Sequence, residues 1–378
     1  FLKTSFDTEK VAIENFELSE SECRETNLRF NCTYERENSK YGSWLYVMRR
    51  KIDQILGEVN FNEVLDLSDW GPGVSTLIKG LDTSATRKYQ SEMGITDGAY
   101  ALVGHLLTKE FPNWFRSQEG IPPEVSIQDG DRVTTVNKNA KTKRTILINP
   151  GLNLYFQKGC GQVIKRRMER VGVDLTHQQT NAELAELGSL TGDLATVDFS
   201  RASDSMATAM VREVLPEDWF NLLSSFRCVQ GTIGGQKRRW EKFSSMGNGF
   251  TWELESLIFY TAALTTCAMH GIVDTRLVSV FGDDVIIPSE VYDSYVDFCA
   301  YLGFTINRSK SYAQGPFRES CGSHWFDGFD VKPIYLVDPL CDVLSLYKLA
   351  NSVRLLAHRR CFNSGCDSRF LPYWRSIV

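Results

Sequence analysis

Several residue patterns are missing from this chain of 378 residues, and each absence narrows the possible functions. The ten cysteines are scattered without a Cys-x-x-Cys pair, and the five histidines show no His-x-x-x-His spacing. Zinc sites use such spacings, so we expect no structural zinc and instead expect reduced, mostly buried thiols. The net charge of −5 argues against a protein coated in positive charge, but it leaves room for a basic channel inside an acidic shell.

Long apolar stretches are also scarce. The longest uncharged segment, residues 256–273, contains several threonines and His270, which favours a buried core helix over a membrane span. The chain starts at Phe1 with no basic-then-apolar leader, so we expect no signal peptide, and the missing initiator Met suggests a processed chain or a fragment. With 42% hydrophobic and 24% charged residues, the composition is that of a soluble globular protein with two or three subdomains.

Helical and strand patterns alternate through the middle third of the chain, which predicts an α/β or α+β core. Breaks are expected at residues 70–73 and at a glycine-rich turn, residues 231–235. Helical spacing predicts helices within residues 1–70, 97–120, 152–171, 216–228, 289–302 and 343–360. Strands are predicted at residues 132–136, 144–148, 193–200, 278–281 and 285–287.

Two adjacent carboxylates, Asp283 and Asp284, lie at the tip of a predicted hairpin. The flanking runs are β-branched and aromatic, as in strands, and Gly282 permits the turn. Paired carboxylates on a rigid hairpin can bind divalent metal, which commonly drives phosphoryl and nucleotidyl transfer. An ordinary turn also favours Gly and Asp for backbone reasons, so this motif alone fits either interpretation.

A third carboxylate strengthens the metal hypothesis. A short apolar strand ends at Asp198, which could lie beside Asp283 and Asp284, and Asp204 follows it. Three carboxylates from two strands suit two Mg²⁺ ions that also bind substrate phosphates. The alternatives are that Asp198 caps the helix after it and that Asp204 belongs to a solvated helical face.

Two further segments fit phosphate chemistry. Gly247 and Gly249 bracket Asn248 just before a predicted helix, where glycine would let the backbone approach a sugar or phosphate. Residues 131–144 carry enough positive charge for a triphosphate, although a solvated basic loop is the usual fate of such a run. The cations of this basic segment are Arg132, Lys138, Lys141, Lys143 and Arg144.

Two other basic patches, residues 165–167 and 237–240, could follow a nucleic-acid backbone. Within the second patch, Trp240 could stack on a base, or it could belong to the core. The sequence leaves both roles open.

The order of these motifs resembles that of palm-domain RNA-dependent RNA polymerases. Within them it is most similar to the replicase catalytic (beta) subunits of single-stranded RNA bacteriophages, the levivirus group. The motifs are the basic segment, Asp-x5-Asp, Ser-Met-Gly-Asn-Gly-(aromatic)-Thr, Gly-Asp-Asp and then Lys310. The resemblance extends over residues 40–378, with further matching segments at residues 70–73, 137–142, 181–204, 244–255, 317–322 and 330–333.

The resemblance implies a right-hand polymerase of the α/β (α+β) class. Its fingers and N-terminal region would be residues 1–190, with the NTP-binding segment at 131–148. The palm, an antiparallel sheet plus helices, would be residues 191–330, with a fingers insertion at about 211–242. Residues 331–378 would start the thumb, which we expect to be short or incomplete because phage replicases continue further. Primer-independent initiation and template exit would then be lost or differently built.

The resemblance also implies site residues. Asp198, Asp283 and Asp284 resemble the ligands of two Mg²⁺ ions, for which Mn²⁺ can substitute. Lys310 resembles the lysine that protonates pyrophosphate, with an ordinary surface lysine as the alternative, and residues 317–322 resemble the hairpin that grips the primer. The implied NTP site consists of a triphosphate clamp, Lys138, Lys141 and Arg144, and a ribose-sensing group, Asp204, Ser245, Gly247, Asn248 and Thr251.

Two positions depart from the wider polymerase pattern. Palm polymerases often have Asn four residues after the motif threonine, where this chain has Glu255, as in the phage replicases. This difference leaves the partner of the ribose 2′-hydroxyl open. The aromatic residue before Gly-Asp-Asp is Phe281 in place of the commoner Tyr.

The implied function is template-directed RNA synthesis from NTPs, replicating a viral RNA genome in the cytoplasm of an infected bacterial host. Its implied partners are template and product RNA, host translation elongation factors and a ribosomal protein, without a membrane. Two alternatives remain. Reverse transcription on the same scaffold is disfavoured by the polar Asp204 in place of a bulky aromatic gate. A non-enzymatic RNA-binding or assembly protein on a degenerate palm is disfavoured because all three carboxylates are present.

Overall fold

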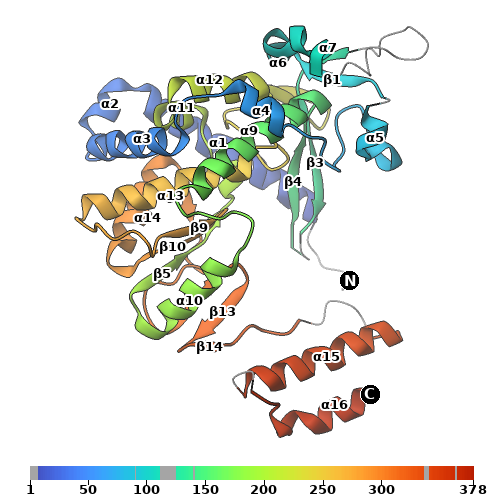
Figure 1. Ribbon diagram of the computed structural model, residues 1–378, viewed down its shortest axis with the longest axis vertical. Helices are drawn as coiled ribbons and strands as arrows, with labels where there is room; N and C mark the ends of the chain where they lie inside the picture. The colour runs from blue at the N-terminus through green and yellow to red at the C-terminus, as the bar shows by residue number, and fades with distance from the viewer. Residues whose placement is uncertain (1–6, 90, 111–124, 139–140, 336–339, 362–363) are drawn as a thin grey trace.

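The structure is a computed structural model that describes residues 7–89, 91–110, 125–138, 141–335, 340–361 and 364–378 (Figure 1). Helices surround several small sheets, so the predicted mixed α/β (α+β) class is confirmed. None of the helices in these ranges is both long and apolar enough to cross a membrane. The division into fingers, palm and thumb stays a prediction.

The N-terminal region is helical, as predicted for the described part of residues 1–70. Its first helix starts after Asp7, whose side chain accepts hydrogen bonds from two backbone N–H groups of the first turn. This helix, α1, packs against α11 and β4, two elements that are distant from it in sequence. The N-terminal helices are α1 (Thr8–Asn31), α2 (Thr33–Asn38), α3 (Gly42–Leu56) and α4 (Phe61–Leu67).

A four-stranded sheet with the order β4-β3-β7-β8 contains the basic segment. The predicted strands at 132–136 and 144–148 are confirmed as an antiparallel pair. The predicted turn at 231–235 is wrong in its first half, because Gly231 pairs with Asp131 inside a strand and only Gly234 and Gly235 turn. A Cβ atom at Gly231 would lie 2.0 Å from Oδ1 of Asp131, so glycine is needed there for close approach. The strands are β3 (Asp131–Asn137), β4 (Lys143–Ile148), β7 (Gln230–Ile233) and β8 (Gln236–Arg239).

The central antiparallel sheet has the order β5-β10-β9. The strands predicted on either side of Gly282 are confirmed, and Phe281 pairs with Asp284 across their hairpin. On the other edge of β10, Val285 pairs with Val197 of β5, which confirms the strand predicted at 193–200. The strands are β5 (Leu194–Val197), β9 (Ser279–Phe281) and β10 (Asp284–Pro288), with the short pair β6 (Phe199–Ser200) and β11 (Thr305–Ile306) alongside.

Helices bury this sheet. The expected core helix near 256–273 is α13 (Thr251–Met269), which is buried on nearly all sides, and Phe199 stacks on its Phe259 with ring centroids 4.0 Å apart. The helices predicted at 152–171, 216–228 and 289–302 are confirmed as α9 (Gly151–Glu169), α12 (Glu217–Phe226) and α14 (Tyr292–Leu302). Two further helices that the sequence analysis did not predict are α10 (Gln179–Thr191) and α11 (Thr208–Val214).

The helix predicted at 97–120 is only partly correct. A 3-10 turn at Gly104–Leu106 divides it into α6 (Asp97–Val103) and α7 (Leu107–Glu110), and residues 111–120 lie outside the described residues. Nearby, β1 (Met93–Thr96) and β2 (Val125–Gln128) form a parallel pair that contacts α6. The short helix α5 (Ala85–Lys88) precedes β1 in the chain. The remaining 3-10 turns are Gly80–Thr83, Ala202–Asp204, Ser289–Val291 and Ser368–Phe370.

The C-terminal part begins with an antiparallel meander of β12 (Phe317–Ser320), β13 (Ser323–Phe326) and β14 (Phe329–Asp330). The helix predicted at 343–360 is confirmed as α15 (Val343–Arg359), and it packs against α16 (Leu371–Ile377). This helical pair lies at the bottom of the view, apart from the helices around the central sheet (Figure 1).

Candidate active site

The three carboxylates predicted to bind metal meet at one end of the central sheet. Because Val197 pairs with Val285, Asp198 and Asp284 are the next residues along two antiparallel neighbouring strands. Asp283 lies in the two-residue loop that joins β9 to β10. The fold therefore brings together side chains that are far apart in sequence.

Burial raises the pKa of all three carboxyl groups. The pKa of Asp198 rises to about 6 through burial and the nearby charges of Asp283 and Asp284, opposed by a hydrogen bond from Asn307 and by the charge of Lys310. The pKa values of Asp283 and Asp284 are raised as well, chiefly by burial. The site therefore concentrates negative charge where water screens it poorly, and a cation would relieve that repulsion.

Asn307, which sequence reasoning missed, holds Asp198. Its Nδ2 donates a 2.7 Å hydrogen bond to Oδ2 of Asp198, and its backbone N–H donates to the Asp198 carbonyl at 2.8 Å. The backbone N–H of Asp198 donates in turn to the hydroxyl of Ser311 at 3.0 Å. Asn307 immediately follows β11, so this short strand pair positions both residues.

Asp284 is held by the β12–β13 turn, within the segment predicted to grip the primer. The backbone N–H of Cys321 donates to Oδ1 of Asp284 at 3.0 Å, and the hydroxyl of Ser320 is 3.3 Å from the same oxygen. The buried side chain of Asn181 donates to the Asp284 carbonyl at 3.0 Å and accepts from the hydroxyl of Ser279 at 2.7 Å. Both sides of the hairpin are thus fixed by buried hydrogen bonds.

The three carboxylates supply oxygen donors of the kind that a divalent cation prefers, but their spacing in this structure is not that of a formed metal site. Among the residues that the structure describes, no group of three or more His, Cys, Asp or Glu side chains is arranged to hold a metal ion. One oxygen of Asp198 is engaged by Asn307, and one oxygen of Asp284 by Cys321. Mg²⁺ and Mn²⁺ prefer oxygen ligands, and the raised pKa values mark the excess negative charge that such an ion would offset.

A pocket of about 180 Å³ lies beside Asp283. Its lining includes the exposed Lys138 and Arg144, from the ends of the β3–β4 hairpin, and Asp204. The charges of Arg144 and Lys138 also oppose the burial that raises the pKa of Asp283. Two predicted triphosphate ligands and the predicted ribose sensor therefore share a pocket with a predicted metal ligand.

Three other basic side chains change the details of this clamp. Lys143 lines the pocket and forms a 2.9 Å ion pair with Glu9, whereas Lys141 is exposed and is not part of the lining. Arg201, which the sequence did not single out, also lines the pocket and pairs with Glu22 at 2.8 Å. Its left-handed backbone, with φ of 56°, opens the 3-10 turn that ends at Asp204.

The predicted ribose-sensing loop is organised by internal hydrogen bonds. The hydroxyl of buried Ser245 donates to Oδ1 of Asp204, while the Ser245 carbonyl accepts from Thr251 Oγ1 at 2.9 Å and from the backbone N–H of Asn248 at 3.1 Å. At Gly247, where φ is 103°, a Cβ atom would lie 2.3 Å from the Leu147 carbonyl oxygen. This glycine therefore allows the loop to pack on β4, a reason that the sequence did not reveal.

Two charged residues lie near the carboxylates. Lys310 is half exposed, with Nζ 3.8 Å from Oε1 of Glu319, and its charge opposes the raised pKa values of Asp198, Asp283 and Asp284. Glu255, at the position that departs from the wider polymerase pattern, is buried and accepts a 2.7 Å hydrogen bond from Ser203. Burial raises the pKa of Glu255 well above its usual value.

The structure also decides between the two roles left open for Trp240. This side chain is buried, its Nε1 donates to Oδ1 of Asp131 at 2.9 Å, and its ring meets Phe16 edge-on. Trp240 is therefore a core residue. In the same patch, Arg238 forms an ion pair with Glu17.

Known proteins resemble this chain over most of its length. Residues 2–364 match the family model described as RNA replicase, beta-chain. The RNA-directed RNA polymerase subunit beta of Enterobacteria phage SP is 37% identical over 92% of this chain and 60% of that protein. The corresponding subunit of Escherichia virus Qbeta is 36% identical over 92% of this chain and 58% of that protein. The RNA-directed RNA polymerase beta chain of Escherichia phage MS2 is 43% identical over 60% of this chain and 41% of that protein.

The chain spans 60% or less of the length of each of these relatives. A more distant structural match is the RNA-dependent RNA polymerase of a human picobirnavirus, with 12% identity and a TM-score of 0.43 over 66% of this chain and 56% of that one. The family match and the phage relatives confirm the resemblance drawn from the motifs, and this chain belongs to the RNA replicase beta-chain family.

Proposed function

We propose that this chain carries the nucleotidyl-transfer centre of an RNA-directed RNA polymerase, which copies a viral RNA genome from NTPs. The observation that carries the proposal is the meeting of Asp198, Asp283 and Asp284 beside a pocket with a basic wall. Membership of the replicase beta-chain family supports the same reaction. In the proposed three-domain organisation, residues 1–190 are the fingers, 191–330 the palm and 331–378 the start of the thumb.

Asp198, Asp283 and Asp284 would hold two Mg²⁺ ions, or Mn²⁺ in their place. Bound there, the ions would lower the pKa of the primer 3′-hydroxyl and neutralise the triphosphate and the leaving pyrophosphate. The protein would contribute the alignment of the three carboxylates, which the strand register and the hydrogen bonds from Asn307 and Cys321 support.

The basic wall of the pocket would bind the triphosphate. Lys138 and Arg144 line the pocket beside Asp283, and Lys141 would reach the outer phosphates from the same hairpin. Lys310 would donate a proton to the leaving pyrophosphate, a role supported by its electrostatic influence on all three aspartates.

Asp204 and the loop that contains Ser245 and Gly247 would recognise the sugar. Asp204 lines the pocket and would accept a hydrogen bond from the ribose 2′-hydroxyl. The hydroxyl of Ser245 donates to Oδ1 of Asp204 and so fixes one oxygen of this carboxylate. Gly247, Asn248 and Thr251 would keep the surrounding loop in shape through its contacts with β4 and its internal hydrogen bonds. A polar acceptor at this position favours ribonucleotides over deoxyribonucleotides.

Family membership also suggests the setting of the reaction. The chain would bind template and product RNA and work with host translation elongation factors and a ribosomal protein. It would act in the cytoplasm of an infected bacterium without a membrane partner.

The test is a nucleotide-incorporation assay with purified protein, an RNA template, four NTPs and Mg²⁺. Asp283→Asn should reduce labelled product by about 100-fold or more, because an amide cannot replace a charged metal ligand. Asp193→Asn removes an exposed carboxylate beside the same sheet and should leave the rate unchanged. Undiminished product from Asp283→Asn contradicts the assigned mechanism, and tight RNA binding without Mg²⁺-dependent turnover favours a non-enzymatic protein. Preferential use of dNTPs favours reverse transcription.

A further inference from the structure

A fully buried lysine, Lys242, contacts Asp204 in the lining of the pocket beside Asp283. Lys242 sits between β8 and α13, and none of its side-chain surface is exposed. An ammonium group is rarely left in such a place unless charged and polar partners compensate for its lost hydration. The function of Lys242 therefore follows from its partners.

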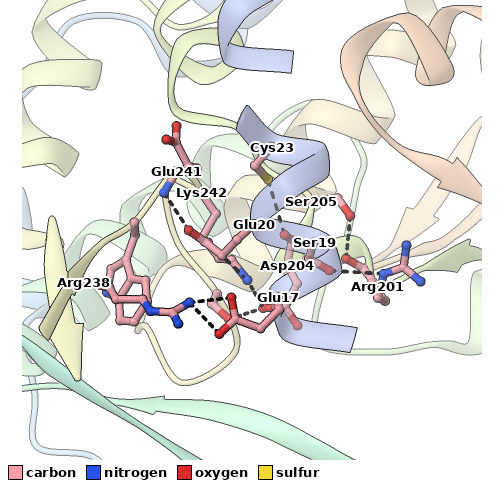
Figure 2. A network of polar contacts seen from close by, with 12 residues as sticks. Glu17, Ser19, Glu20, Cys23, Arg201, Asp204, Ser205, Arg238, Glu241 and Lys242 are labelled. Carbon is pink, nitrogen blue, oxygen red and sulfur yellow. Dashed lines mark hydrogen bonds and ion pairs between the residues drawn. The ribbon is translucent and has the colours of Figure 1, made fainter. Parts of the chain in front are cut away.

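Those partners come from two separate parts of the chain (Figure 2). The Nζ atom of Lys242 lies 3.2 Å from Oδ1 of Asp204 and 3.5 Å from Oε1 of Glu20 on α1. The same atom lies 3.6 Å from the centroid of the Phe16 ring, also on α1. The other carboxylate oxygen of Glu20 accepts a 2.8 Å hydrogen bond from the backbone N–H of Glu241, the residue before Lys242. Glu20 on α1 therefore contacts both the side chain of Lys242 and the backbone next to it.

The contacts to the Asp204 side chain are confined to one of its oxygens. Lys242 and the hydroxyl of Ser245 both donate to Oδ1. Within the described residues no hydrogen bond reaches Oδ2, although Asp204 lines the pocket with 17% of its side chain exposed. One oxygen is therefore fixed by the protein, and the other is available to a ligand.

We propose that Lys242 is a positioning residue for sugar recognition, which fixes Oδ1 of Asp204 so that Oδ2 accepts the ribose 2′-hydroxyl. The inference rests on the proposed function, because it takes the pocket to be the NTP site. Lys242 does not touch the nucleotide and acts only through Asp204. A 2′-deoxy sugar leaves a fixed acceptor unpaired, whereas a mobile carboxylate can turn away, so the fixed one discriminates more strongly.

A purely structural role for Lys242, joining α1 to the rest of the chain, is less favoured. Other ion pairs already make that connection, among them Glu17 to Arg238 (Figure 2) and Glu22 to Arg201. Neither of these pairs contacts the Asp204 carboxylate. Lys242 is distinguished from them by its burial and by its contact with the pocket wall.

The test measures the preference of the chain for ATP over 2′-deoxy-ATP by titration calorimetry with Mg²⁺. The preference is expressed as the dissociation constant of 2′-deoxy-ATP divided by that of ATP, so a higher ratio means a stronger preference for ATP. Lys242→Met keeps the length of the side chain and should lower this ratio about tenfold, the size expected when one charged hydrogen bond no longer orients the acceptor. Arg238→Gln removes an α1 ion pair away from Asp204 and should leave the ratio unchanged. If the ratio measured for Lys242→Met lies within about twofold of the wild-type ratio, the inference is overturned.

A second comparison holds even if Lys242→Met alone fails to fold. Asp204→Asn should lower the ratio by itself, and adding Lys242→Met to it should change the ratio no further, because the lysine acts only through this carboxylate. A further fall in the double variant overturns the inference, as does a wild-type chain without any preference for ATP. Binding is measured without turnover, so a chain that prefers ATP but makes no RNA contradicts only the proposed polymerase reaction.

Discussion

The backbone N–H of Cys321 donates a 3.0 Å hydrogen bond to Oδ1 of Asp284, and an uncommon backbone conformation makes this contact. Cys321 has φ of 51° and Gly322 has φ of 69°, so both central residues of the β12–β13 turn are left-handed. Such turns match the twist of a hairpin, but a residue other than glycine adopts this region at a cost. Here the strained residue is the one that supports a candidate metal ligand.

Cys321→Val should damage both the turn and the site. A β-branched residue disfavours left-handed backbone, so we expect a loss of about 1–2 kcal/mol in the free energy of unfolding. Valine keeps the backbone N–H, but a shifted turn would move this donor away from Asp284, which should lower the incorporation rate about tenfold. Thermal denaturation and initial rates measure the two effects. Cys321→Gly, which adopts this conformation readily, should keep the activity, and equal activity of the Val and Gly variants would show that the N–H contact is unimportant.

Asn307 should control the pH dependence of the reaction through Asp198. Without a bound cation the pKa of Asp198 is raised to about 6, and its protonated form cannot ligate a cation. At Mg²⁺ concentrations below saturation, the wild-type rate should therefore fall as the pH drops below about 6. The hydrogen bond from Asn307 lowers this pKa. Asn307→Leu removes it, so the acidic limb of the rate profile should move to higher pH.

The control for this shift is Ser309→Ala, which removes a hydroxyl that donates to Asn307 and leaves the contact with Asp198 in place. Its rate profile should match that of the wild type. If the acidic limb of Asn307→Leu stays where the wild-type limb lies, Asp198 is not the group whose protonation limits the rate.

The sequence predicted the parts of the site that depend on local pattern. Apolar β-branched runs around Gly282 predicted the hairpin, and a short apolar strand ending in Asp198 predicted the third carboxylate, because such runs fit a buried pleated sheet. The basic segment was also recognisable, since charge density is visible without a fold. Of the three predicted clamp residues, Lys138 and Arg144 line the pocket, whereas Lys141 is not part of the lining.

The supporting contacts were not predictable, because they join distant parts of the chain. Asn307 is 109 residues from Asp198, and nothing in its local sequence distinguishes it from a loop residue. Lys242 lies two residues beyond the basic patch at 237–240 and was not singled out, yet its side chain is buried, because α1 covers it. Exposure is a property of packing, which also explains why the role of Trp240 stayed open until the fold placed it against Asp131.

Gly282→Ala should show how far activity depends on the geometry of the hairpin, because it changes the turn and leaves the charges of Asp283 and Asp284 unaltered. At Gly282, φ is 64° and a Cβ atom would lie 2.4 Å from Nε1 of Trp252, so alanine must displace that ring and the adjacent Asp283. We expect at least a tenfold loss of incorporation, equivalent to about 1.4 kcal/mol in the activation barrier. Gly315→Ala has a similar φ of 72° with open space around it, so it should cost only about 1 kcal/mol of stability and leave the rate unchanged. Similar rates for the two variants would contradict the steric explanation.

Asp131 should make the protein less stable as the pH rises. Burial raises its pKa to about 7, opposed by the hydrogen bond from Trp240, whereas its usual value is 3.8. Between these values the folded state keeps a proton that the unfolded state releases, so its contribution to the free energy of unfolding falls by up to about 1.4 kcal/mol per pH unit. Asp131→Asn keeps an acceptor for Trp240 without this titration, so its stability relative to wild type should increase from pH 4 to pH 7 in urea denaturation. Asp129→Asn, on an exposed neighbour, should follow the wild-type curve, and a parallel curve for Asp131→Asn would show that Asp131 is ionised in the folded protein throughout this range.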